Sequence, residues 1–373
     1  MDDSIDSVEN DDERVELYRQ LKALWGIAGI QARKWISNSP KVIEAITTEE
    51  RATEIVINSG QDPITKTLGI SWNSTEDVFT VTASAVFPGF QTTKRNVLRK
   101  VATIFEPLGF ACSYVIMAKI LLHELWMRGY DWNDEVRDEI ADKIGDWLEQ
   151  LKSLQEVKIF RCLRRPDPVK RIVTFADASQ QPYGPAVCMR FEYDNDTVTG
   201  RLIAAKGKVA SFDPMTVPRL ELMGVILGLR STQSLPMVLE SPMQSMTFFS
   251  DSTDVLWRIR GRGKDFRPFV ANRIGEIQMF TEPSQWQHVS TVENPADLCT
   301  RRASSSELAE CPLWCKGPNW LTNDFSEWSK MKVPDRPSKM PEIRTSKRKE
   351  ETNACATLMT IVDFQLFCLV DTG

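Results

Sequence analysis

The sequence is poor in histidine and contains no long uninterrupted apolar run. Only two of its 373 residues are histidine, and its eight cysteines are scattered without paired spacing. Cys311 and Cys315 have no second pair to complete a zinc site, so zinc is disfavoured. The apolar runs are interrupted by Lys119, His123 and Asp363 and are too short to cross a bilayer. We therefore expect no membrane partner and, because a secretory leader and a disulfide pattern are lacking, an intracellular location.

The formal net charge of −5 by itself disfavours nucleic acid as a partner. Seven acidic residues lie before Arg14, however, and without these seven the formal charge is +2. Local patches therefore matter more than the total. One patch combines a tryptophan with several cations, and it either binds a nucleic-acid backbone or forms a solvated basic face. Its residues are Trp257, Arg258, Arg260, Arg262, Lys264, Arg267 and Arg273.

The first half of the chain reads as a hairpin followed by helices. An amphipathic helix is expected over 14–37, and two β-rich runs at 67–72 and 78–83 flank turn-forming residues. Three helices follow, one from Thr93 to about Phe105, a second that carries Ile116, Ile120, Leu121 and Leu125, and a third at about 134–154. The apolar face of the first of these is expected to consist of Leu98, Val101, Ile104 and Phe105. This region is therefore predicted to be a small hairpin with a helical bundle.

After residues 164–168 the pattern changes to strands. Three β-rich runs separated by turn residues predict an antiparallel meander, and helices then alternate with strands. The expected strands are 171–175, 186–193, 200–209, 245–250 and 285–290, and the expected helices are 218–232, 252–260, 266–280 and one from Asn294. This order predicts an α/β fold with a mixed sheet flanked by helices. Beyond Trp328 the chain is rich in Pro, Lys, Arg and Glu, which predicts a mostly disordered tail.

Four acidic residues occupy the ends of these elements. Asp177 and Asp251 each close a predicted strand, whereas Glu221 and Asp297 lie in the first turns of predicted helices. Taken singly, each is also explained as a cap or as a charge that complements the helix dipole. Taken together, they offer the hard oxygen ligands that Mg²⁺ prefers, and two such ions promote phosphodiester hydrolysis. We therefore predict one site for two Mg²⁺ ions, with Mn²⁺ as an alternative, that cuts RNA.

A series of different short motifs follows in order along most of the chain up to about Leu321. They are Thr93–Arg95, Ile104–Gly109, Ala118–Leu121, Glu124–Trp126, Pro218–Leu222, Ser250–Thr253, Phe269–Arg273 and Glu293–Leu298. With these motifs the chain resembles the reverse transcriptase and ribonuclease H segment of BEL/Pao retrotransposon polyproteins. The resemblance implies a ribonuclease H-like fold in which Asp177, Glu221, Asp251 and Asp297 bind the metal ions. It further implies cleavage of the RNA strand of an RNA–DNA hybrid, with other parts of a retroelement polyprotein as partners and a retroelement particle as the location.

The same resemblance divides the chain into four parts. They are a polymerase palm remnant at 1–92, a helical thumb and connection at 93–165, a ribonuclease H-like domain at 166–325, and a disordered tail at 326–373. Asp2 and Asp3 resemble the end of the polymerase motif Tyr-x-Asp-Asp, and residues 68–72 resemble the hairpin that grips the primer. Reverse transcription is expected to be lost, because the rest of the palm would precede this chain.

Two alternatives remain beside the nuclease. One is a catalytically inactive, nucleic-acid-binding relic of a retroelement. The other is an aspartic peptidase, since Leu369–Gly373 contains Asp-Thr-Gly, but a second copy of this triplet is missing. Many ribonucleases H carry a mobile histidine between their third and fourth acids. Here His288 falls inside a predicted strand, which favours a structural role.

Overall fold

The computed structural model describes most of the chain up to Trp328. The described residues are 10–52, 64–67, 70–81, 83–84, 86–161, 169–193, 197–235, 243–301 and 303–328, with Asp6, Val8, Val333, Asp335, Glu342 and Ile343. Several predictions fall wholly or partly outside them, among them Asp2 and Asp3, residues 68–69 of the primer-grip hairpin, the boundary at 164–168, Leu369–Gly373 and most of the predicted tail at 326–373. In the part of the chain that is described, no helix has the length and apolar character needed to cross a membrane.

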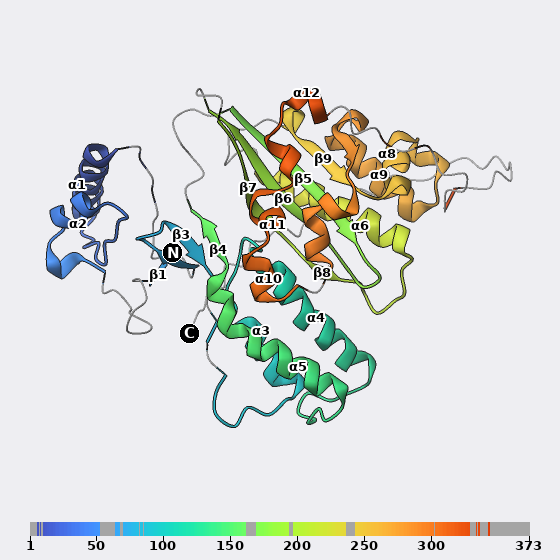
Figure 1. The fold of residues 1–373 in the computed structure, drawn as a ribbon, viewed down its shortest axis with the longest axis horizontal. Helices are drawn as coiled ribbons and strands as arrows, with labels where there is room; N and C mark the ends of the chain where they lie inside the picture. Colours follow the sequence, from blue (N-terminus) through green and yellow to red (C-terminus); the bar gives the residue numbers. More distant parts are fainter. Residues whose placement is uncertain are drawn as a thin grey trace.

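The N-terminal helix is shorter than predicted. Helix α1 (Asp11–Ile27) begins after Asn10, whose side chain accepts a hydrogen bond from the Glu13 backbone N–H. It ends ten residues before the predicted end, because the chain turns at Gly29 with φ of 72°. Helix α1 packs on α2 (Pro40–Ala45), and this pair lies at one side of the molecule (Figure 1).

The predicted hairpin is part of a larger antiparallel sheet. Its strands, in the order β1-β2-β3-β4, are β1 (Ile64–Thr67), β2 (Ile70–Asn73), β3 (Val78–Thr80) and β4 (Lys158–Phe160). The β2–β3 hairpin confirms the prediction for residues 70–80. Strands β1 and β4 were not predicted, and β4 joins the sheet from the far end of the helical region. The helical region therefore begins and ends at this sheet.

Three helices form the bundle between β3 and β4. They are α3 (Lys94–Ala102), α4 (Cys112–Met127) and α5 (Glu139–Glu149), and the 3₁₀ segment η2 (Gln150–Glu156) continues α5. The predicted apolar face of α3 is wrong in part, since Leu98 and Phe105 are 44% and 52% exposed whereas Val97 is fully buried. The cause is that Lys94 and Lys100 lie on the buried face, where lysine stems replace apolar side chains.

A mixed sheet carries the second half of the fold. Its strands are β5 (Val169–Ala178), β6 (Pro182–Glu192), β7 (Val198–Ala205), β8 (Lys208–Val209), β9 (Thr247–Ser250) and β10 (Trp286–His288). The sheet order is β10-β9-β5-β6-β7, with β8 paired to β6. Strands β5, β6 and β7 form the predicted antiparallel meander. Strand β9 runs parallel to both β5 and β10, so the predicted mixed sheet is confirmed.

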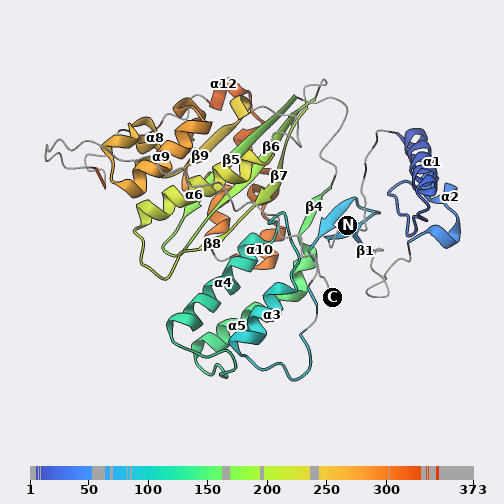
Figure 2. The ribbon, with the colours of Figure 1, turned by 180° about the vertical axis from the view of Figure 1, so that it is seen from behind.

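Helices cover both faces of this sheet (Figures 1 and 2). On one face lie α6 (Val217–Gln233), α8 (Thr253–Arg260) and α9 (Pro268–Phe280). On the other face lie α10 (Ser305–Ala309), α11 (Pro312–Lys316), η8 (Asn319–Thr322) and α12 (Phe325–Trp328). Trp328 is buried against this second face, so the prediction of disorder from residue 326 begins too early. Successive side chains of β5 point to opposite faces of the sheet, so they pack alternately into the hydrophobic cores on its two sides.

Candidate active site

Asp177 and Asp251 lie side by side at one edge of the mixed sheet. Strands β5 and β9 are parallel, and Ala176 pairs with Ser250 in their register. The next residue on each strand is one of the two acids, so both carboxylates leave the sheet at the same level. Asp177 is only 7% exposed. The sequence prediction of two neighbouring strand-end acids describes this arrangement correctly.

Glu221 reaches the same edge because α6 lies unusually close to β5. A Cβ atom on Gly224 would stand 2.7 Å from the Asp177 backbone oxygen, so no larger residue fits there without a shift. One turn further on, Gly228 faces Thr174, and the hydroxyls of Thr174 and Thr232 are 2.6 Å apart. Small residues at four-residue spacing therefore hold the helix against the strand. Glu221, one turn before Gly224, lies beside Ser252, which donates a hydrogen bond to it, and within reach of the charge of Asp251.

Asp297 is carried by a 3₁₀ helix, η7 (Pro295–Cys299), and not by the predicted α-helix. Asn294 has no exposed surface, and its amide donates a hydrogen bond of 3.2 Å to the Ala176 carbonyl. Its side-chain oxygen accepts from the Ala296 N–H and so caps η7. The residue that starts the short helix therefore also fixes it to the end of β5, which brings Asp297 to the other acids.

The acids influence one another electrostatically. The pKa of Asp177 is raised to about 6, first by burial and also by the charges of Asp251 and Asp297, against the hydrogen bond from Thr300. Burial raises the pKa of Glu221 to about 7, and the charges of Asp251 and Asp254 act in the same direction. The pKa of Asp297 is also raised, first by burial and then by Asp251, against the opposing effect of Arg301. A cation at this edge would relieve the repulsion.

Each of the four carboxylates also has a partner within the chain. Thr300 donates to Asp177, Ser252 donates to Glu221 at 2.5 Å, Thr291 donates to Asp251 at 2.8 Å, and Arg301 forms an ion pair with Asp297 at 2.7 Å. Among the residues that the structure describes, no three His, Cys, Asp or Glu side chains are arranged to hold a metal ion. The predicted single site of four ligands is therefore not formed by these side-chain positions.

The chemistry of this edge nevertheless fits a hard divalent cation. All four groups are carboxylates with oxygen donors, and three of them have raised pKa values because burial and mutual repulsion disfavour their charge. Their partners are mostly hydroxyls, which an ion can displace by a rotation about a side-chain bond. Such an ion would be held by Asp177 and Asp251 from the strands, with Glu221 and Asp297 beside them.

The predicted basic patch is only partly available to a ligand. Arg260 donates to the carbonyls of Leu256 and Trp286, and Arg273 donates to the Phe269 carbonyl and lies over the Phe269 ring. These two arginines hold the fold together. Arg262, Lys264 and Arg267 are exposed, and Trp257 is partly buried. Sequence reasoning overestimated the patch because it could not see that these arginines bond to backbone carbonyls of the fold.

Three further residues around the acids were not identified from the sequence. They are Thr300, which contacts Asp177, Thr291, which contacts Asp251, and Ser252, which contacts Glu221. Ser252 follows Asp251 directly and could have been suspected, whereas nothing in the sequence marks Thr291 or Thr300. His288 lies on β10 opposite Ser250, within a strand as predicted.

The mixed sheet with an antiparallel meander, crossing helices and edge carboxylates defines a ribonuclease H-like domain. Residues 93–252 match the family model described as the Pao retrotransposon-like RNaseH-like domain. The match confirms the resemblance to BEL/Pao retrotransposon proteins. It includes Asp177, Glu221 and Asp251, and it begins in the helical bundle.

Several solved structures are also similar to this chain. The N-terminal RNase H domain of a Mycobacterium tuberculosis protein, fused to maltose-binding protein, is 18% identical and covers 38% of this chain and 99% of its own, with a TM-score of 0.26. LC11-RNase H1, in complex with an RNA/DNA hybrid, is 14% identical with the same coverages and TM-score. A foamy viral protease-reverse transcriptase with double-stranded DNA is 11% identical and covers 78% of this chain and 55% of its own, with a TM-score of 0.21. No curated protein matches.

Proposed function

We propose that this chain is a metal-dependent ribonuclease H that cleaves the RNA strand of RNA–DNA hybrids within a retroelement polyprotein. The observation that supports the proposal is the position of Asp177 and Asp251 at the ends of two paired parallel strands, with the charge of Asp251 acting on Asp177, Glu221 and Asp297. Repulsion and burial raise the pKa of Asp177 to about 6 and that of Glu221 to about 7. A protein keeps such an arrangement at a functional site more often than elsewhere. The family match supports the same reaction.

The role proposed for each of the four acidic side chains follows from the element that carries it. Asp177 and Asp251 anchor the site from the rigid strand ends, and Glu221 and Asp297 complete it from helices. Mg²⁺ or Mn²⁺ held by these carboxylates would supply an activated water and would stabilise the leaving oxygen. Thr300, Thr291 and Ser252 hold three of the carboxylates in place beforehand. Burial raises the pKa of Glu221 to about 7, and Glu221 would have to be in its carboxylate form to hold such an ion.

The experiment is a cleavage assay with the full chain, a labelled RNA–DNA hybrid and Mg²⁺. We expect the RNA strand to be cut, chelation by EDTA to stop the reaction, and Asp251→Asn to lower the rate about a thousandfold. Asp265→Asn is the matched control, because Asp265 is an acid of the same domain that pairs with Arg262 on the surface. Equal cleavage by the parent chain and Asp251→Asn would exclude the proposal.

A second candidate is a nucleic-acid-binding protein without catalysis. The observation in its favour is that each of the four carboxylates already has a partner within the chain. This candidate predicts hybrid binding that weakens with salt, through cations such as Arg262, Lys264 and Arg267, but no cleavage in Mg²⁺ or Mn²⁺. Binding and cleavage measured on the same preparation separate the two.

A further inference from the structure

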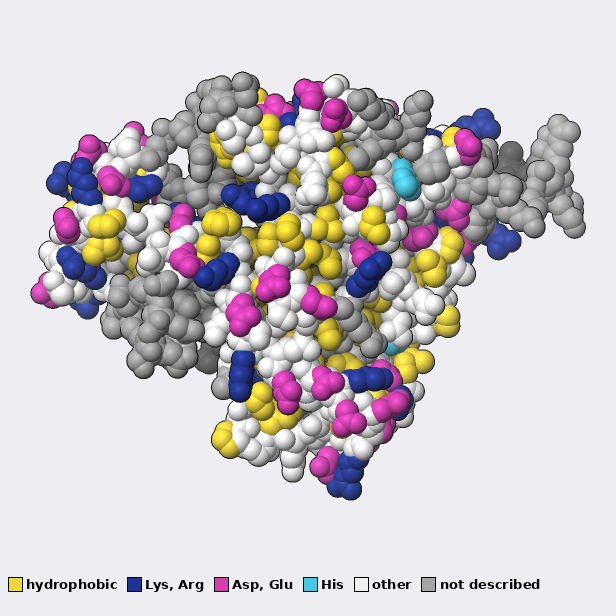
Figure 3. Space-filling view, viewed as in Figure 1, with side chains coloured by type: hydrophobic (Ala, Val, Ile, Leu, Met, Phe, Trp, Pro, Cys, Tyr) yellow, Lys and Arg dark blue, Asp and Glu magenta, His cyan; other side chains and the backbone are white. Residues whose placement is uncertain are grey.

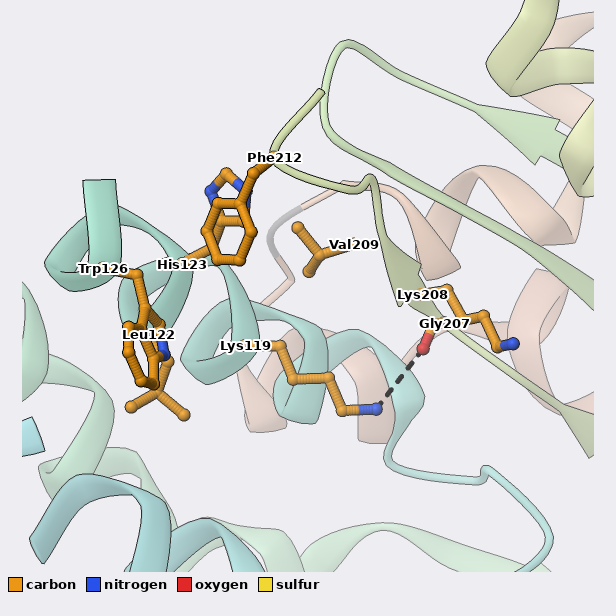
Figure 4. Close-up of a pocket in the computed structure, with 8 residues that line it drawn as sticks. All are labelled: Lys119, Leu122, His123, Trp126, Gly207, Lys208, Val209 and Phe212. Atoms are coloured by element: carbon orange, nitrogen blue, oxygen red, sulfur yellow. Dashed lines mark hydrogen bonds between the residues drawn. The ribbon is translucent and has the colours of Figure 1, made fainter. Parts of the chain in front are cut away.

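A pocket lies between the helical bundle and the mixed sheet, away from the four acids. Its volume is about 350 Å³, and α4 forms one wall while the segment 207–212 forms the other (Figure 4). Lys119, His123 and Trp126 come from α4, and Lys208 and Phe212 come from the opposite wall. The pocket thus combines aromatic rings with cations.

The rings of His123 and Phe212 stack at a centroid distance of 4.7 Å with an interplanar angle of 11°. Phe212 is 56% exposed, so its face away from His123 is open to a ligand (Figure 4). Trp126, 45% exposed, already has the Lys94 ammonium over its ring at 3.7 Å. The Nε2 atom of His123 is buried and has no hydrogen-bond partner among the described residues. Phe212 is therefore the ring best placed to receive a planar group.

Lys119 and Lys208 line this pocket, and a third lysine, Lys206, lies within electrostatic reach of both. Lys119 is held there by a hydrogen bond of 3.3 Å to the Gly207 carbonyl, and Lys206 and Lys208 flank that glycine. Burial lowers the pKa of Lys206, and the charges of Lys208 and Lys119 lower it further, which places the three within electrostatic reach. Glu106 also acts on Lys119, but burial raises the pKa of Glu106 to about 7 and so weakens its negative charge.

The rest of the bundle surface is different. Two residues beyond Trp126, Arg128 is surrounded by Glu124, Asp138 and Glu139 at 2.6–2.9 Å. On the face of the molecule drawn in Figure 3, basic and acidic side chains lie next to one another over the helical bundle. The three lysines thus form a local positive site and are not part of a generally basic bundle.

The fold connects this pocket to the edge that carries the acids. Lys208 pairs with Tyr183, and Tyr183 pairs with Ala178, the residue after Asp177. Two strand spacings, or about 10 Å, therefore separate the backbone at Lys208 from the end of β5. Helix α4 spans the same distance, since Ser113 at its start contacts the Arg301 carbonyl near Asp297, whereas Lys119 and His123 follow two to three turns later.

We infer that this pocket binds one nucleotide of a single-stranded extension of the nucleic acid, with its phosphate at Lys119, Lys206 and Lys208 and its base on Phe212. The inference rests on the proposed function for the identity of the nucleic acid. A combination of cations with an open ring is what single-strand binding requires, because every base has a face that can stack. The pocket would extend the nucleic-acid path from the ribonuclease H-like sheet onto the bundle.

The experiment compares a blunt RNA–DNA hybrid with hybrids that carry a short single-stranded extension on the RNA or the DNA strand, at either end. Binding of the full chain is measured by fluorescence anisotropy in EDTA, so that cleavage plays no part. We expect one of the extensions to tighten binding about tenfold. We expect Phe212→Ala to remove most of that gain and Lys208→Ala to weaken its salt dependence. The strand and end that produce the gain identify the source of the nucleotide.

Lys152→Ala is the matched control, since Lys152 is an exposed lysine on η2 outside the pocket. Phe212→Leu keeps an apolar side chain but removes the stacking ring, and thermal unfolding verifies that each variant is folded. Equal binding of blunt and extended hybrids would overturn the inference, as would equal effects of Lys208→Ala and Lys152→Ala. Cleavage of hybrids without tighter binding of any extended hybrid would contradict the proposed nucleotide pocket but not the proposed nuclease. Tighter binding of an extended hybrid without cleavage in Mg²⁺ would contradict the proposed nuclease but not the pocket.

Discussion

The helical bundle pairs its charged side chains with charges of opposite sign, whereas the edge of the mixed sheet brings acidic side chains together. In the bundle, apolar residues such as Ile140, Ile144 and Trp147 fill the core, and Arg128 is neutralised by acids at the surface. At the sheet edge, four acids share one location, and burial and mutual repulsion raise the pKa values of three of them. The bundle therefore neutralises its surface charge with ion pairs, whereas the sheet edge keeps charges of one sign together at a cost in folding stability.

One acid in the helical region departs from this division. Glu106, between α3 and α4, accepts a hydrogen bond from the Ala111 N–H at 3.1 Å, and burial raises its pKa to about 7. It is thus as unfavourably placed as the acids of the sheet edge, but without an acidic cluster around it. Glu106 and Asp177 therefore offer a direct comparison between a buried acid of the bundle region and one of the candidate active site.

The largest expected effect is that of Asp177→Asn. Cleavage should fall about a thousandfold, because a ligand for the ions is lost. Stability at neutral pH should rise by about 2–3 kcal/mol without metal, because burial raises the pKa of Asp177 from 3.8 to about 6 and its charge therefore opposes folding. Hybrid cleavage and denaturant unfolding in EDTA measure the two effects. A loss of both activity and stability would mean that Asp177 is needed for folding.

A smaller effect is expected for Glu106→Gln, and it should depend on pH. Burial raises the pKa of Glu106 from 4.5 to about 7, so the parent chain loses stability as pH rises between these values. The variant lacks this loss and should be more stable at pH 8 by an amount on the order of 3 kcal/mol, with little difference at pH 4. Cleavage at a fixed pH should stay close to that of the parent chain. Unfolding curves across this pH range test the prediction, and a difference that does not change with pH would refute it.

The smallest effect concerns the distance between α6 and β5. Gly224→Ala places a methyl group against the Asp177 backbone oxygen, so the helix must move and shift Glu221. We expect a loss of about 1–2 kcal/mol in stability and about tenfold in cleavage. Gly275→Ala in α9 is the control, because nothing lies within 4 Å of its added Cβ and alanine favours a helix by up to about 1 kcal/mol. Similar behaviour of the two variants would rule out the close approach as the cause.

The sequence predicts elements best where local pattern and tertiary packing agree. The strands that carry or precede Asp177 and Asp251 are rich in apolar and β-branched residues, and their positions follow from the order of elements. The face of α3 was misassigned because Lys94 and Lys100 are buried through their stems, which no hydrophobic pattern reveals. Strand β4 was missed because three residues carry little periodicity.

Within the candidate site, the identity of the acids could be predicted, but their contacts could not. Thr300 donates to Asp177 across 123 positions of sequence, and only the folded chain brings the two together. The orientation of each carboxylate toward a hydroxyl or an arginine is likewise a tertiary property. The glycine at position 224 is an intermediate case, since its spacing to Gly228 was visible but its contact with β5 was not.

The pairing of β3 with β4 affects the order in which the chain folds. Residues 78–80 pair with 158–160, so this ladder of three residues closes a loop that contains the entire bundle. Closing so long a loop costs conformational entropy, and three residue pairs compensate for little of it. The bundle instead forms through contacts between neighbouring helices, which are fast to establish. We therefore expect the bundle to fold first and to bring β4 within reach of β3, which makes completion of the four-stranded sheet a late kinetic step.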